Sequence, residues 1–68
     1  MNILLLGSGG REHALAWKLS KSPHCSKLYI APGNPGTAGS GENISMDIHD
    51  FSAIASCCKQ KGIDIVVV

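Results

Sequence analysis

Several features typical of nucleic-acid-binding, membrane and disulfide-rich proteins are missing from this 68-residue chain. Its formal net charge is +1 and only 16% of its residues are charged, which gives no basic field for nucleic acid or anionic lipid. No apolar run is long enough to span a bilayer, and the run at 3–6 is too short for a signal-peptide core. Three cysteines without Cys-x-x-Cys spacing favour reduced thiols. We therefore expect a cytoplasmic chain that binds small molecules, with no nucleic acid or membrane partner.

Two nucleotide-binding signatures are also missing. No Gly-Lys-Ser or Gly-Lys-Thr triplet occurs, so the Walker phosphate loop is absent. A dinucleotide fingerprint that began with Gly7 and Gly9 would need its third glycine at position 12, where the chain has Glu12. The second predicted strand ends at 31–33 without an acid for a ribose diol. An oxidoreductase domain that binds NAD is therefore the least favoured alternative.

A glycine-rich turn between a buried strand and a helix is what the chain does contain. Residues 3–6 are all apolar, as a strand buried on both faces of a parallel sheet requires. Gly7, Gly9 and Gly10 then let the backbone reverse, and a helix is expected to begin near Arg11. The first N–H groups of a helix lack acceptors and carry the positive end of its dipole. The turn therefore predicts a cradle for a phosphate, which a side chain at Gly9 or Gly10 would obstruct.

The hydrophobic pattern predicts strands that alternate with helices. The expected elements are strands at 2–6, 27–31, 44–46 and 63–68 and helices at 11–21 and 51–61. Such alternation implies right-handed crossovers and a parallel sheet. We therefore expect an α/β fold, a Rossmann-like half-domain with flanking helices that is truncated at the end of a strand.

The second predicted helix has a clear start, stripe and stop. Asp50 is the expected N-cap and Gly62 the expected stop signal. The apolar spacing predicts a core-facing stripe of Phe51, Ile54, Ala55 and Cys58. Cys57 is expected at the margin of this stripe, and a structural role is favoured over a reactive thiol for both cysteines.

Three polar residues open the first predicted helix, and each has two interpretations. Arg11 would pair with a phosphate through its planar guanidinium or form a surface ion pair. Glu12 is expected to point toward the sheet at the mouth of the glycine turn, where it would either complement the helix dipole or bond a ligand hydroxyl or amine. For His13 a packed or exposed role is favoured over a ligand contact. No metal is assigned to any histidine.

The segment 32–42 is rich in glycine and proline and has no hydrophobic period. It is longer than the usual connection in such folds, which suggests a binding loop, although composition alone favours a surface loop. It follows the carboxyl end of the strand predicted at 27–31, which we expect to lie beside the first strand. The loop and the glycine turn would then meet over one ligand.

Two longer motifs agree in order and separation with a known family. They are Gly-Ser-Gly-Gly-Arg-Glu-His-Ala-Leu-Ala-Trp-Lys-Leu at 7–19 and Ala-Pro-Gly-Asn-Pro-Gly-Thr-Ala at 31–38. Over essentially its whole length the chain closely resembles the amino terminus of glycinamide ribonucleotide synthetase, also called phosphoribosylamine–glycine ligase. The resemblance implies that residues 1–68 are the N-terminal part of a pre-ATP-grasp, Rossmann-like substrate-binding domain. The ATP-grasp and C-terminal domains of the family would lie outside this chain, and the 32–42 segment becomes a binding loop.

The resemblance also implies a reaction. Glycine would be activated by ATP as glycyl phosphate, and the amine of 5-phosphoribosylamine would attack it, giving glycinamide ribonucleotide, ADP and phosphate in purine biosynthesis. ATP and Mg²⁺ (or Mn²⁺) would bind to the other domains, so this segment alone is expected to be inactive and to supply no catalytic residue. The implied substrate-phosphate contacts are Gly9, Gly10, Arg11, Glu12, Asn34, Pro35 and Gly36. A nucleotide-binding regulatory module without catalysis is the alternative function.

Overall fold

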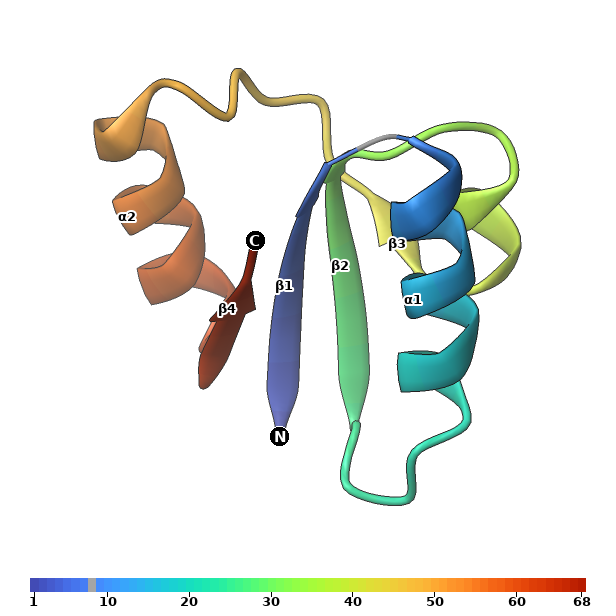
Figure 1. Ribbon diagram of the computed structural model, residues 1–68. Helices are drawn as coiled ribbons and strands as arrows, with labels where there is room; N and C mark the ends of the chain where they lie inside the picture. Colours follow the sequence, from blue (N-terminus) through green and yellow to red (C-terminus); the bar gives the residue numbers. More distant parts are fainter. Residues whose placement is uncertain (8) are drawn as a thin grey trace.

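The computed structural model describes residues 1–7 and 9–68; Ser8, the second residue of the glycine turn, lies outside the described part. Within it, a parallel sheet has the order β3-β2-β1-β4 (Figure 1). Its strands are β1 (Asn2–Gly7), β2 (Lys27–Pro32), β3 (Glu42–Asn43) and β4 (Ile65–Val67). The helices are α1 (Gly10–Ser20), α2 (Phe51–Lys61) and the short 3-10 helix η1 (Thr37–Gly39). The expected α/β fold with a parallel sheet and flanking helices is confirmed.

The two longer helices cover opposite faces of the sheet (Figure 1). Buried side chains on the α1 face form one cluster, made of Ile3, Leu5, Ala16, Leu28 and Ile30. Those on the α2 face form a second cluster, made of Leu4, Tyr29, Ala31 and Cys57. Successive side chains of a strand point to opposite faces, so β1 and β2 each contribute to both clusters. This explains why their sequences are apolar without alternation.

The third strand lies earlier in the chain than the sequence predicts. It covers Glu42–Asn43, and the predicted strand at 44–46 is wrong. The N–H of Ile44 still donates to the carbonyl of Ile30 at 2.7 Å. The next donor along β2 would be Pro32, which has no N–H, so the parallel ladder stops there. The apolar residues of this stretch instead pack against the α2-face cluster without strand pairing: Ile44, Met46 and Ile48.

Both ends of α2 lie where the sequence predicts them. The side chain of Asp50 accepts a hydrogen bond from the N–H of Ala53 at 3.1 Å, which caps the first turn. Gly62 follows the last helical residue with φ 61°, and its N–H bonds to the carbonyl of Cys58. This left-handed conformation is the reason a glycine ends the helix.

The face that α2 turns toward the sheet differs from the prediction. Phe51 is 80% exposed, and Cys57, expected at the margin, is buried while Cys58 is only partly buried. The sheet-facing stripe is rotated one step around the helix and includes Lys61, whose Nζ lies 5.5 Å from the ring centroid of Tyr29. Ile54 and Cys58 pack against the α2-face cluster as predicted, whereas Phe51 and Ala55 are exposed, so half of the predicted stripe is confirmed and half is wrong. Burial, with a smaller contribution from Cys58, raises the pKa of the Cys57 thiol, and Lys61 opposes this rise.

The two connections that contain α1 and α2 lead to opposite sides of β1 in the sheet. The connection through α1 leads to β2 on one side of β1, and the connection through α2 leads back to β4 on the other side. Open α/β sheets bind their ligands beyond the carboxyl ends of the strands near such a reversal. Neither helix in the described ranges is long and apolar enough to cross a membrane.

Candidate functional site

Two loops leave the carboxyl edge of the sheet at the same point. In the parallel register of β1 and β2, Gly7 pairs with Pro32. The N–H of Gly33 donates to the carbonyl of Gly7 at 3.1 Å, which extends this contact beyond the strands. The glycine turn at 7–10 and the loop at 33–41 are thus held side by side, as the sequence predicts.

The glycine turn ends at the N-terminus of α1. Gly9 is the N-cap residue, has an extended backbone (φ −80°, ψ −178°) and offers no side chain to cap the helix. Its carbonyl accepts the first helical bond, from the N–H of His13 at 3.0 Å. The N–H groups of the three preceding helical residues have no acceptor within the helix and lie at the positive end of its dipole. This geometry suits an anion.

Glu12 fills the inside of the turn. A Cβ atom added to Gly7 would lie 2.6 Å from Oε1 of Glu12, and one added to Gly9 would lie 3.1 Å from Oε2. The Glu12 side chain is only 19% exposed. The prediction that it points toward the mouth of the turn is therefore confirmed. Gly7, with φ 143°, has both the backbone conformation and the lack of space that favour glycine, whereas a side chain at Gly9 would need a small shift of the carboxylate. Gly10 is different, because a Cβ there would meet nothing within 4 Å.

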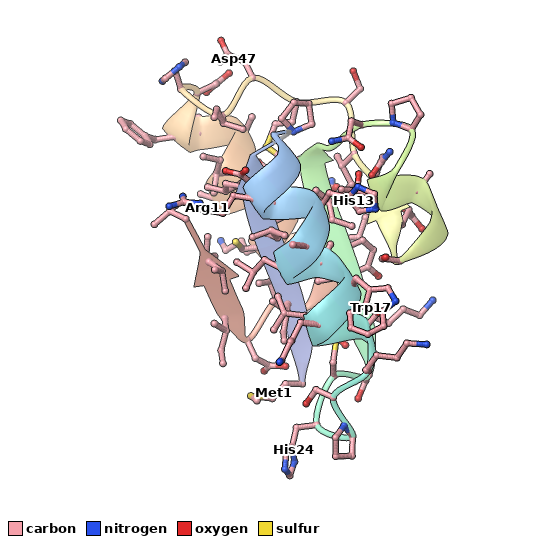
Figure 2. All side chains as sticks on the ribbon, turned by 45° about the vertical axis from the view of Figure 1, so that its right-hand side comes forward. Met1, Arg11, His13, Trp17, His24 and Asp47 are labelled. Carbon is pink, nitrogen blue, oxygen red and sulfur yellow. The ribbon has the colours of Figure 1, made fainter. Side chains whose placement is uncertain are left out.

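Arg11 extends away from the turn. Its side chain is 81% exposed, and Nη2 lies 3.8 Å from Oε1 of Glu12. An ion pair this long and this exposed contributes little to stability. Arg11 and His13 leave the first turn of α1 toward opposite sides (Figure 2). The guanidinium is therefore free to turn toward an anion at the helix start.

Shallow hollows lie on both sides of this helix start. One has a volume of about 440 Å³ and is lined by Leu5, Arg11, Glu12, Ala14, Leu15, Lys18 and Val68. The other has a volume of about 330 Å³ and is lined by Gly10, His13, Ala14 and Trp17. Glu12 and Arg11 thus share one hollow, while Gly10 and His13 share the other.

Reciprocal hydrogen bonds between Asn34 and Thr37 organise the second loop. Oδ1 of Asn34 accepts hydrogen bonds from the N–H groups of Gly36 (2.8 Å) and Thr37 (3.0 Å). In return, Oγ1 of Thr37 accepts from the N–H of Asn34 at 2.8 Å. Pro35 lies inside this turn and has no N–H that would need a partner. The Asn-Pro-Gly-Thr sequence thus forms a reciprocally bonded turn just before η1, whose N-cap residue is Gly36.

A buried polar cluster anchors this turn to the sheet. Thr37 is fully buried, and its hydroxyl lies 2.8 Å from the carbonyl of Asn34 and 2.7 Å from Oδ1 of Asn43. Nδ2 of Asn43, on β3, also donates to the carbonyl of Asn34 at 2.8 Å. The sequence analysis did not identify Thr37 or Asn43 as turn-forming residues. The Asn-x-x-Thr spacing was a usable signal for Thr37, but no local pattern indicates Asn43.

His13 connects the two loops. A Cβ atom added to Gly36 would lie 2.6 Å from Cε1 of the imidazole and 3.1 Å from Oδ1 of Asn34. The ring therefore lies against the backbone of Gly36 while the residue as a whole is exposed, which agrees with the favoured interpretation of His13 as packed or exposed. Gly36 has ordinary helical angles, so its backbone conformation does not require glycine, and a side chain there would meet the ring of His13.

The structure brings all seven predicted contact residues to one end of the sheet: Gly9, Gly10, Arg11, Glu12, Asn34, Pro35 and Gly36. In the described ranges, no group of three or more His, Cys, Asp or Glu is placed to hold a metal ion. The three cysteines lie outside this end of the sheet and have free thiols.

The family model for the phosphoribosylglycinamide synthetase N domain matches residues 1–68. The chain belongs to this family. It is 59% identical to a phosphoribosylamine–glycine ligase of Mesorhizobium japonicum over 68 residues, which cover 100% of the chain and 16% of that protein. It is 50% identical to the trifunctional purine biosynthetic protein adenosine-3 of Gallus gallus, with 97% of the chain and 7% of that protein covered.

A solved structure supports the same membership in the phosphoribosylglycinamide synthetase family. The crystal structure of a phosphoribosylamine–glycine ligase from Thermotoga maritima matches with a TM-score of 0.66 and 32% identity. The match covers 100% of the chain and 16% of that protein. The chain thus spans about one sixth of the length of its bacterial relatives, and the resemblance found in the sequence is confirmed.

Proposed function

We propose that this segment forms the substrate side of a ligase that joins glycine to 5-phosphoribosylamine, giving glycinamide ribonucleotide, ADP and phosphate in cytoplasmic purine biosynthesis. The observation that carries this proposal is the Gly7–Pro32 register, which sets the two family motifs side by side at the carboxyl edge of the sheet. The names of the matched relatives support the two substrates that are joined, and the use of ATP is what the resemblance to this family implies. The proposed domain is the N-terminal part of a substrate-binding domain, with the other domains of the enzyme as its partners.

In this proposal the segment binds and orients the sugar phosphate. The uncapped N–H groups at the start of α1 and the guanidinium of Arg11 hold phosphate oxygens. The Asn34–Gly36 turn closes the opposite side of the site. No covalent nucleophile is needed from these residues, because positioning two reactants supplies a large part of such a rate enhancement.

ATP and magnesium would be held by other domains of the enzyme. When bound, they would supply the phosphoryl group that activates glycine and the positive charge that stabilises it. The described residues offer no cluster of metal ligands, so we assign none of them to either group. The proposed role of this segment is independent of how those groups are bound.

The first experiment is ADP release by the full-length enzyme with ATP, magnesium and glycine, with and without freshly generated phosphoribosylamine. We expect ADP release to require both glycine and phosphoribosylamine. ADP release that ignores phosphoribosylamine would sink the proposed function and leave an anion-binding fold of unknown purpose.

A second experiment tests the site through Gly10→Ala. The structure has open space for this Cβ, so the free protein should fold normally, whereas a phosphate at the helix start would meet the new methyl group. We expect the KM for phosphoribosylamine to rise about 10-fold or more while the KM for ATP is unchanged. Gly39→Ala is the matched control, because a Cβ at Gly39 also meets nothing within 4 Å. Equal effects of the two variants would contradict the placement of the phosphate.

Gly9→Val is a less direct probe of the same site. It should also raise the KM for phosphoribosylamine far more than the KM for ATP. However, a side chain at Gly9 would approach Oε2 of Glu12 even without ligand. Its effect would therefore combine obstruction of the phosphate with displacement of the carboxylate.

A further inference from the structure

The position of Glu12 divides the proposed site into two chemically different halves. Both carboxylate oxygens lie inside the glycine turn, one against Gly7 and the other against Gly9. The start of α1, which follows the turn, carries N–H groups without a side-chain cap instead. An anion placed inside the turn would meet a like charge, whereas one placed at the helix start would meet donors.

Among the residues that the structure describes, the carboxylate has only a weak ionic contact, with Arg11, whose nearest nitrogen is 3.8 Å away and whose side chain is 81% exposed. An ionised carboxylate has acceptors only, with room for several hydrogen bonds. A ligand group that contacts Glu12 must therefore be a donor, such as a hydroxyl or an amine.

We propose that Glu12 is a specificity-determining residue that accepts a hydrogen bond from a donor on the sugar ring, a hydroxyl or the anomeric amine, and does not contact the phosphate. This inference rests on the proposed function and refines the role of one residue in its set. The hollow that Glu12 shares with Arg11 gives a ligand access to the carboxylate. Arg11 and the helix start remain on the phosphate side.

The test compares two competitive inhibitors of the full-length enzyme, ribose 5-phosphate and inorganic phosphate, measured against phosphoribosylamine. For Glu12→Ala we expect the inhibition constant of ribose 5-phosphate to rise about 10- to 100-fold, as loss of a hydrogen bond to a charged group implies. The constant for inorganic phosphate should stay the same or fall, because a nearby negative charge has been removed. Arg11→Ala is the opposite control and should weaken both inhibitors.

Glu12→Gln guards against a folding defect, because glutamine keeps the shape of the side chain that packs against the two glycines. We expect the same direction of change for both inhibitors with a smaller loss for ribose 5-phosphate, since the amide oxygen still accepts. Repeating the series with 2-deoxyribose 5-phosphate identifies the donor. If the penalty disappears, the donor is the 2-hydroxyl; if it persists, the donor is another group on the ring.

Two results would overturn the inference. Equal weakening of ribose 5-phosphate and inorganic phosphate by the Glu12 variants would put this residue on the phosphate side. No change in either constant would give the carboxylate a purely structural role. Failure of the proposed function is recognised separately, because the wild-type enzyme would then show no dependence on phosphoribosylamine, and the inference would fall with it.

Discussion

The two loops at the carboxyl edge of the sheet differ in how their polar groups are satisfied. The Asn34 turn bonds to itself and to β3 through the buried hydroxyl of Thr37 and the side chain of Asn43. The glycine turn instead lies around the carboxylate of Glu12, whose contact with Arg11 is 3.8 Å long. This turn ends at the N-terminus of α1, which has no side-chain cap. One loop is complete without a ligand, while the other presents acceptors and donors.

This difference suggests that the Asn34 turn supports the site and that the glycine turn binds the ligand. A loop with satisfied hydrogen bonds holds its shape before the substrate arrives, which lowers the entropy lost on binding. Groups without a partner in the protein gain the most binding free energy from a ligand. Each new bond to them displaces water only and breaks no bond within the protein. We therefore expect variants of the Asn34 turn to affect local stability and variants of the glycine turn to affect binding.

The largest expected effect is that of Gly33→Ala. Gly33 has φ 72°, and a Cβ there would lie 2.6 Å from Cγ of Asn43 and 2.8 Å from Oγ1 of Thr37. Backbone strain together with a disrupted polar cluster should cost about 2–4 kcal/mol of local stability. Hydrogen–deuterium exchange of the 33–43 segment in the full-length enzyme measures this cost, with Gly39→Ala as control. Unchanged protection would mean that this polar cluster does not hold the Asn34 turn rigid.

Thr37→Val should have an intermediate effect. Valine keeps the buried shape of threonine but removes the hydroxyl and, with it, the hydrogen bonds between this hydroxyl and Asn34 and Asn43. The loss of hydrogen bonds in a buried cluster costs about 1–3 kcal/mol. Thr37→Ser keeps the hydroxyl and loses a methyl group worth about 0.8 kcal/mol. In the same hydrogen–deuterium exchange experiment, Thr37→Val should lower the protection of the 33–43 segment more than Thr37→Ser does. The opposite order would show that the polar cluster does not make this turn rigid.

The smallest effect should come from the contact that joins the two loops. Gly36→Ala places a methyl group against the imidazole of His13, which is exposed and able to rotate away. We expect a cost below about 1 kcal/mol. In the His13→Ala background this cost should vanish, because the obstructing ring is gone. A double-mutant cycle measures the coupling, and equal costs in both backgrounds would show that the loops are independent.

The outline of the fold could be predicted because the elements have strong local signals. The buried run at 3–6, the Asp50 cap and the Gly62 stop each report a local requirement of the backbone. The direction of Glu12 was also predictable, since it precedes the sheet-facing residues of α1 at helical spacing. These features depend on residues close together in sequence.

The features that were mispredicted or missed depend on a partner far along the chain. The end of β3 is set by the missing N–H of Pro32 on the neighbouring strand. The orientation of α2 follows from contacts with the sheet, such as that of Lys61 with Tyr29, which leave Phe51 exposed and Cys57 buried. Asn43 joins the Asn34 turn through the sheet, so its amide could not be read as part of that turn. Local patterns identified the loops, and tertiary contacts determined how they are held.

The strand order also affects how this domain is made. Its central strand, β1, is synthesised before both of its neighbours, and β4 follows only after residues 8–64. At about 5–20 residues per second, β1 waits for several seconds before the strand on its β4 side is made, with apolar side chains and one row of backbone N–H and C=O groups unpaired. During that interval the same continuous apolar run that later forms the core is a site for chaperone capture or mispairing. Translation speed over the codons for residues 1–68 is therefore expected to influence the yield of folded enzyme.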